Sequence, residues 1–168
     1  MTTFLMEAVA LCALFHLAVW LQVRQDPARR VYSYSPAFVE RYIELGKIPD
    51  KKNPGTLEGV KKTWPTAIVL GILLGAIVFF ANGARSFLNG FLVSYGLWLI
   101  VDWYDAIVID ILWLCHSKMY ILPGTEDMAE DYHDYGYHVK ASGIGMLIGL
   151  PVCLLIGLVV QVISWIAA

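Results

Sequence analysis

Apolar residues in this sequence fall into four long blocks that charged stretches separate. The blocks predict helices over about residues 3–23, 65–82, 87–115 and 141–167. A helix needs about 20 mainly apolar residues to cross a bilayer, and in lipid only helices and closed barrels satisfy every backbone hydrogen bond. We therefore expect an all-α fold, a single transmembrane bundle over residues 1–168, with two loops at 24–63 and 116–140 that each hold a short helix.

The composition supports a membrane protein. Of the 168 residues, 58% are hydrophobic and 15% are charged, whereas soluble domains carry about 25% charged residues. Residues 24–63 contain nine Lys and Arg residues, residues 116–140 contain two, and Arg85 is the remaining one. The positive-inside rule then places both loops in the cytoplasm and both termini outside. This topological role of the positive charge gives no support to nucleic-acid binding.

The first loop contains the signals of a short amphipathic helix. Ser35 fits an N-cap and Pro36 the first helical position, while Phe38 and Tyr42 recur at helical spacing. Gly46 can end the helix. Such a helix is expected in the headgroup region or under the bundle, with a partner-binding role as the alternative.

Small residues recur every four positions in the second and fourth blocks, which permits close helix packing. The two ladders are Ala67, Gly71 and Gly75, and Ala141, Gly145, Gly149, Cys153 and Gly157. The contact can lie within one chain or between subunits, so a homo-oligomer through these faces is one expectation. The three cysteines lie in or at the end of apolar blocks and are expected to be packing residues.

Asp102, Asp105 and Asp110 lie within the third block, although one ionised Asp at the centre of a spanning helix costs about 2.5–3.5 kcal/mol. At about 100° per residue, Asp102 and Asp105 share a face and Asp110 lies to one side. His16 has a matching depth in the first block and can reach either of that pair. These four candidates predict a proton- or cation-handling site in which two carboxylates share a proton. The alternative is a polar clamp between helices, with His16 bonded to a carbonyl.

The second loop predicts a helix that starts at Thr125 and ends at Gly136. Such a helix would carry Glu126, Glu130 and His133 on one face, with His116 and His138 on either side in the sequence. Mixed carboxylate and imidazole ligands suit Zn, Mn or Fe. The loop is therefore a candidate metal site, and the alternative is a solvated acidic helix.

Polar and aromatic residues concentrate at Asp110 and in three stretches, DWYD at 102–105, LPGTE at 122–126 and DYGYH at 134–138. In these stretches the chain resembles small uncharacterised bacterial integral membrane proteins with four helices. The resemblance implies that these polar positions belong together and that the membrane is the bacterial inner membrane. It implies no activity, cofactor or catalytic residue.

Three functions fit the sequence. A binding or accessory membrane subunit, with a polar site near the cytoplasmic face and membrane lipids around it, needs only the packing faces and a solvated loop. A membrane enzyme acting on a lipid or other amphiphile, with or without a metal, needs the loop acids and histidines to converge with Asp110. A small proton- or cation-coupled transporter needs Asp102 and Asp105 to line a path for water. We expect the first of these.

Overall fold

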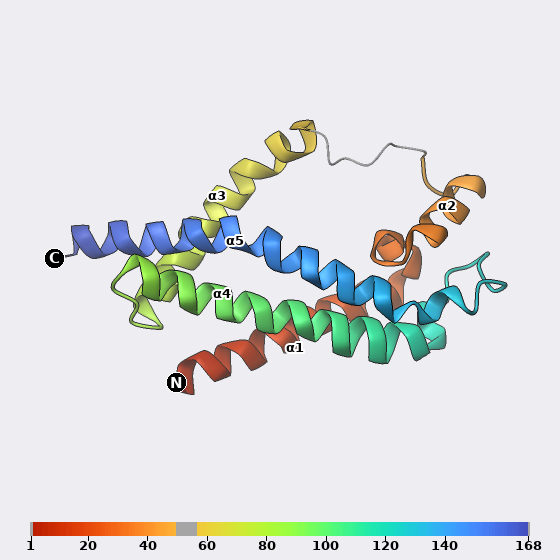
Figure 1. The fold of residues 1–168 in the computed structure, drawn as a ribbon, viewed down its shortest axis with the longest axis horizontal. Coiled ribbons are helices and arrows are strands. Elements are labelled where there is room, and N and C mark those ends of the chain that lie inside the picture. The colour runs from red at the N-terminus through yellow and green to blue at the C-terminus, as the bar shows by residue number, and fades with distance from the viewer. Residues whose placement is uncertain (1, 50–56, 168) are drawn as a thin grey trace. The chain divides into compact units, whose positions relative to one another are not determined.

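The computed structural model describes residues 2–49 and 57–167, without the side chains of residues 57–64 and 67. Within these ranges every regular element is a helix (Figure 1), so the all-α prediction is confirmed. In chain order the elements are α1 Thr2–Gln25, η1 Pro27–Ser33, α2 Pro36–Glu44, α3 Leu57–Phe80, α4 Phe87–Tyr104, the π-helix η2 Asp105–Trp113, η3 Leu114–His116, η4 Lys118–Tyr120, η5 Asp131–His133 and α5 Tyr135–Ile166. The part of the first predicted loop at 50–56 lies outside the described residues.

Two of the described helices, α1 and α5, are long and apolar enough to cross a membrane. Only 17% of the apolar stretch of α1 and 28% of that of α5 is buried in the structure. Neither therefore has the covered surface of a core helix in a soluble protein. The α3 helix contains a shorter apolar segment, Ile68–Phe80. A bundle of four spanning helices stays a prediction.

The third block differs from the uniform helix expected over 87–115. The α4 helix ends at Tyr104 and is followed directly by the π-helix η2 and the 3₁₀ turn η3. Backbone hydrogen bonds in a π-helix join residues five apart, so its turn is wider than that of an α-helix. Asp105 and Asp110 are five residues apart, and of the two only Asp110 is among the buried residues of the π-helix. The prediction that Asp110 lies to one side of Asp102 and Asp105 assumed α-helical geometry throughout, and it stays a prediction.

The short helix of the first loop is confirmed as α2. Pro36 lies in its first turn, and Phe38 and Tyr42 are its buried residues. Ser35 holds the N-cap position without a side-chain hydrogen bond. Gly46 follows the helix with a φ of 65°, a left-handed conformation that glycine adopts without strain.

The helix expected over residues 125–136 does not form, since this part of the chain consists of turns and the single 3₁₀ turn η5. The hydroxyl of Thr125 lies 2.6 Å from that of Tyr132, so it makes a tertiary contact instead of capping a helix. Asp134 caps the next helix, because its carboxylate accepts a hydrogen bond from the backbone N–H of Tyr137 at 3.0 Å. The predicted helical face in this loop is therefore absent.

The chain divides into two compact units. The first contains the segments Met1–Ala10, Lys52–Val101 and Ile144–Ala168, and the second contains Leu11–Lys51 and Asp102–Gly143. The helices α1, α4 with its π-helical continuation, and α5 each contribute residues to both units. Each unit has its own buried apolar core.

In the first unit the small-residue faces pack against neighbouring helices of the same chain. A Cβ added at Gly149 would lie 2.3 Å from Nε1 of Trp98, and one added at Gly75 would lie 2.5 Å from the side chain of Val159. Nε1 of Trp98 also donates a hydrogen bond to the carbonyl of Gly145 at 3.0 Å. These faces are thus in use within the chain, and a homo-oligomer through them stays a prediction.

The second unit has a core rich in aromatic residues from α1, η1, α2 and the segment that follows α4. Tyr34, Phe38 and Tyr132 form a cluster in which the rings of Phe38 and Tyr132 lie 4.4 Å apart between centroids. The α2 helix is thereby fixed to its own unit through its apolar face. This core surrounds the polar side chains that form the candidate site.

Candidate functional site

Asp110 and His138 form a buried pair in the second unit. Oδ2 of Asp110 lies 3.1 Å from Nδ1 of His138, and their side chains are 11% and 4% exposed. Asp110 shares the buried face of the π-helix with Ala106 and Ile109, while His138 lies in the first turn of α5. An ionised carboxylate only accepts hydrogen bonds, so Nδ1–H of His138 is the donor of this hydrogen bond when Asp110 is ionised.

Arg30 and Asp105 form a second pair on the same unit. A terminal nitrogen of Arg30 lies 3.9 Å from Oδ1 of Asp105, with side chains 12% and 30% exposed. The η1 helix presents Arg30: Asp26 caps this helix by accepting a hydrogen bond from the backbone N–H of Ala28 at 2.9 Å, and Pro27 begins it. A buried charge without a partner is strongly destabilising. Arg30 therefore stabilises the carboxylate of Asp105.

Several buried polar atoms of this unit have no hydrogen-bond partner in the described part of the chain. They are Nε of Arg30, Oδ2 of Asp102, Oδ1 of Asp105, Oδ1 of Asp110 and the hydroxyl of Tyr120. An unsatisfied buried group costs about 1–3 kcal/mol, so such a concentration marks a place of functional interest. Burial raises the pKa of Tyr120 above its usual range; Arg30 lowers it, and Asp110 and Asp105 raise it further.

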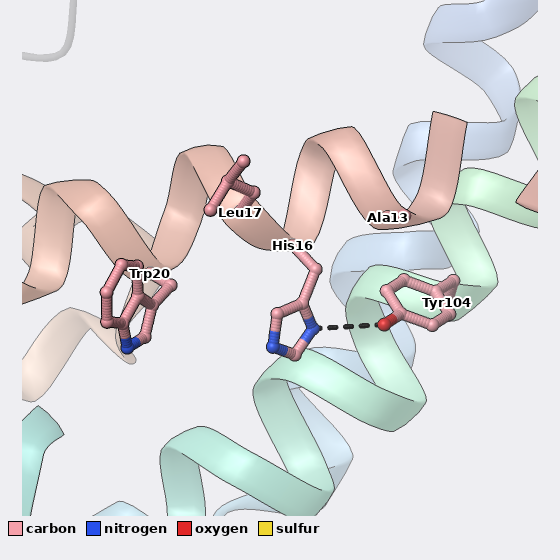
Figure 2. A pocket seen from close by; sticks show the side chains of 5 residues that line it. All are labelled: Ala13, His16, Leu17, Trp20 and Tyr104. Carbon is pink, nitrogen blue, oxygen red and sulfur yellow. Dashed lines mark hydrogen bonds between the residues drawn. The ribbon is translucent and has the colours of Figure 1, made fainter. Parts of the chain in front are cut away.

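A pocket of about 460 Å³ opens beside α1 in the second unit. Its walls are Ala13, His16, Leu17, Trp20 and Tyr104 (Figure 2). Nδ1 of His16 lies 3.0 Å from the hydroxyl of Tyr104, and Figure 2 shows His16 and Trp20 projecting from the same side of α1. The imidazole also stacks on Trp113, with 4.6 Å between ring centroids and 1° between planes. The hydrogen-bond partner of His16 is thus the residue that directly precedes the π-helix.

Two of the predicted metal ligands lie near each other, and a third is engaged elsewhere. The rings of His116 and His133 lie 5.5 Å apart between centroids, whereas His138 is paired with Asp110. Glu130 and His133 both lie on the solvent-exposed part of the loop. Among the described residues no three His, Cys, Asp or Glu side chains are grouped so that they could hold a metal ion. A Zn, Mn or Fe site stays a prediction.

Glu126 is engaged with the turn that precedes it. Its carboxylate accepts the backbone N–H of Gly124, at 3.0 Å to each oxygen. These backbone hydrogen bonds lower the pKa of Glu126 below its usual range. Gly124 itself has a φ of 93°, which allows the turn to close. This acid therefore stabilises the loop at Pro123-Gly124.

Four residues of the site were missed from the sequence: Arg30, Tyr104, Trp113 and Cys115. Arg30 counts among the topological charges of the first loop, but Asp26-Pro27 signals a helix start that would orient it. Cys115 follows Asp110 by five residues and is buried in the core of the second unit. No pattern of α-helical spacing brings these side chains together, because the intervening segment is π-helical.

Comparison with known proteins found no family model, no curated protein and no solved structure that matches this chain. The function therefore has to be inferred from the side chains of the chain itself.

Proposed function

We propose that the chain is a multi-pass membrane protein that binds an amphiphilic small molecule in the pocket at His16. The membrane location is supported by large apolar side chains that are exposed along three helices. Met6 on α1 is 72% exposed, Phe80 on α3 is 74% exposed and Leu147 on α5 is 66% exposed. Apolar surface on this scale is unstable in water and is stabilised by lipid.

The four apolar blocks then serve as spanning segments of a bacterial inner membrane, with both loops cytoplasmic and both termini outside. This orientation rests on the concentration of Lys and Arg in residues 24–63. The end of the third block, with Asp110 and the loop that follows, then lies near the cytoplasmic face.

The pocket is apolar except for one polar pair, His16 and Tyr104, and this pair supports the proposal. Small-molecule pockets of about 300–1,000 Å³ are mainly apolar, with a few polar groups that fix orientation, and the 460 Å³ pocket has this character. Nδ1 of His16 is engaged with Tyr104, while its other ring nitrogen lies on the side away from Tyr104 (Figure 2). That nitrogen can bond the polar head of a ligand whose apolar part contacts Leu17 and Trp20.

A photoactivatable fatty acid carrying a diazirine tests the pocket. Full-length protein in detergent should be crosslinked on α1 near His16, and excess unlabelled oleate should compete in a saturable manner. Leu17→Trp fills the pocket and should lower this crosslinking several-fold. Leu14→Trp is the matched control, because Leu14 is 64% exposed on the same helix and does not line the pocket.

Equal crosslinking of the Leu17→Trp and Leu14→Trp variants would contradict the proposal. So would crosslinks that spread evenly over all exposed apolar faces without competition by oleate, because such labelling reports ordinary contact with lipid.

A further inference from the structure

Arg24 lies beside the pocket at His16 and adds a positive charge to it. Its guanidinium lies over the ring of Trp20, one of the pocket walls, at 5.1 Å from the ring centroid. An arginine that stacks on an aromatic face is ordered by this contact and keeps the N–H groups at its edge for other partners. Arg24 is exposed, and none of the ion pairs between described residues includes it. Its charge is therefore available to a molecule in the pocket.

His16, Trp20 and Arg24 follow one another at intervals of four residues along α1. In an α-helix this spacing places neighbours on one side, about 6 Å apart along the axis. Long side chains on a helix extend back toward its N-terminus, in agreement with the position of the guanidinium over Trp20. The charge is thus carried to the level of Trp20, one helical turn from His16 and within the Debye length of about 8 Å at physiological salt.

The polar groups around the pocket suit a ligand head that accepts hydrogen bonds. The indole of Trp20 and the guanidinium of Arg24 only donate, whereas His16 and the hydroxyl of Tyr104 can donate or accept. Figure 2 shows the indole nitrogen of Trp20 and the second ring nitrogen of His16 on the same side of α1. No aspartate or glutamate is among the described residues that line the pocket. An ammonium head would thus find no negative partner in the walls, whereas a carboxylate or phosphate would find donors and a positive charge.

Two carboxylates lie close to Tyr104 in the sequence, but neither is a wall of the pocket. Asp105 is paired with Arg30, whose terminal nitrogen lies 3.9 Å from its Oδ1. Asp102 lies two residues before Tyr104 on α4, and side chains two apart on an α-helix do not face the same way. The charge that acts on the pocket is therefore that of Arg24.

We propose that the pocket at His16 takes a single-chain amphiphile with an anionic head, a carboxylate or a phosphate, and that Arg24 on Trp20 selects the negative charge. This ligand class rests on the proposed function of the same pocket. His16 bonds the head, and the apolar chain contacts Leu17 and Ala13. Arg24 lies in the last turn of α1, which reaches the cytoplasmic interface in the proposed orientation. The charged head is thus held near the interface while its chain lies at the depth of lipid.

The experiment measures competition with a neutral probe, a long-chain alcohol that carries a photoactivatable diazirine. Full-length protein in a non-ionic detergent is labelled near His16, and unlabelled oleyl phosphate, oleate, oleyl alcohol or oleylamine competes. The four competitors share one chain and differ in the head. The two anions should displace the probe at about fivefold lower concentration than oleyl alcohol, as expected for one charge at this distance in a partly aqueous site. Oleylamine should be weakest, and the stronger anion identifies the head as phosphate or carboxylate.

Arg24→Gln removes the charge and keeps a polar side chain. It should abolish the advantage of the anions and leave displacement by oleyl alcohol unchanged. Arg24→Lys should retain part of the advantage, because the charge remains without the planar group that stacks on Trp20. Arg29→Gln is the matched control, because Arg29 is also exposed but donates to Oε1 of Gln25 at 2.9 Å instead of lying over Trp20. Thermal unfolding should show that every variant keeps its fold.

Salt gives a second measure of the same charge. An increase from about 0.1 M to about 1 M shortens the Debye length from about 10 Å to about 3 Å. The advantage of the anions over oleyl alcohol should therefore decrease in wild type, while Arg24→Gln should show no such change.

Equal displacement by all four competitors, or strongest displacement by oleylamine, would overturn the selection of anions and leave the amphiphile pocket in place. An advantage of the anions that persists in Arg24→Gln, or that is lost equally in Arg29→Gln, would also overturn the role of Arg24. Absence of saturable labelling near His16 would remove the pocket itself and this inference with it. Failure of the ligand class and failure of the proposed function are therefore distinguishable.

Discussion

Three tyrosines in the second unit hold buried hydroxyl groups in an aromatic core. The hydroxyl of Tyr34 donates to the carbonyl of Tyr120 at 2.6 Å, and that of Tyr132 accepts the backbone N–H of Leu122 at 2.7 Å. Burial raises the pKa of all three phenols above the usual range. Folding therefore favours the neutral form of these phenols, so the stability of the folded chain depends on pH in the alkaline range.

The sign of this dependence follows from proton binding. Above about pH 10, where tyrosine in an unfolded chain ionises, the folded chain retains more protons than the unfolded chain. Stability from these phenols is therefore complete below that pH and is lost as pH rises further. The pKa values of Tyr42 and Tyr137 are also raised by burial, so phenolate absorbance should show about five late or unfolding-coupled phenols, and Tyr34→Phe should remove one of them.

Tyr32→Phe is the control for Tyr34→Phe, because Tyr32 is 64% exposed in the short helix that ends just before Tyr34, and this change should leave the late phase unchanged. Ionisation of every tyrosine in one transition near pH 10, with the fold intact, would contradict the buried environment. Alkaline unfolding of both variants at the same pH as wild type would contradict the link to stability.

Helix contacts in the first unit depend on the absence of a side chain at chosen glycines. At Gly149 an added Cβ would meet the indole of Trp98 at 2.3 Å, whereas at Gly143 on the same helix it would meet nothing within 4 Å. Gly149→Ala should therefore destabilise the protein by about 1–3 kcal/mol through overpacking. Gly143→Ala should be neutral or stabilising by up to about 1 kcal/mol, since alanine favours helix. Thermal unfolding in detergent measures both.

If Gly149→Ala unfolded at the temperature of wild type, the close contact with Trp98 would be wrong. A matched Trp98→Phe change with Gly149→Ala should recover part of the loss, because it removes the nitrogen that lies nearest to the added carbon. Destabilisation by Gly143→Ala of the same size would instead indicate a general intolerance of α5 to substitution.

Long apolar runs made the helices predictable, and local capping signals made the α2 helix predictable from Pro36 to Gly46. The π-helix was not predictable, because its sequence has the same apolar composition as an α-helix and only i→i+5 bonding distinguishes it. Thr125 also matched the pattern of a helix N-cap, but its hydroxyl interacts with that of Tyr132 and does not cap a helix. The acids were therefore found as candidates, while Arg30, the partner of Asp105, was not.

Charge and apolar surface act on the molecule as a whole. The segment at 24–63 carries most of the Lys and Arg residues, and the turn between α3 and α4 carries only Arg85. The guanidinium of Arg85 donates hydrogen bonds to the backbone carbonyls of Phe79 and Ala84, so this side chain is engaged within its own turn. The Lys and Arg residues are therefore concentrated in residues 24–63, away from the turn that contains Arg85.

The proposed orientation predicts the side on which introduced thiols react. In a background with Cys12, Cys115 and Cys153 replaced by alanine, Ala81→Cys at the end of α3 should react with an impermeant maleimide added to intact cells. Ala129→Cys and Glu40→Cys should react only after the membrane is opened. All three positions are exposed in the structure, so differences in labelling report the side of the membrane and not burial in the fold.

Labelling of Ala129→Cys from outside, with Ala81→Cys protected, would invert the topology and place Cys115 and His138 near the outer face. Labelling of all three in intact cells would remove the four spanning segments, because Ala81 and Ala129 are separated by the third block and must lie on opposite sides if that block crosses the membrane.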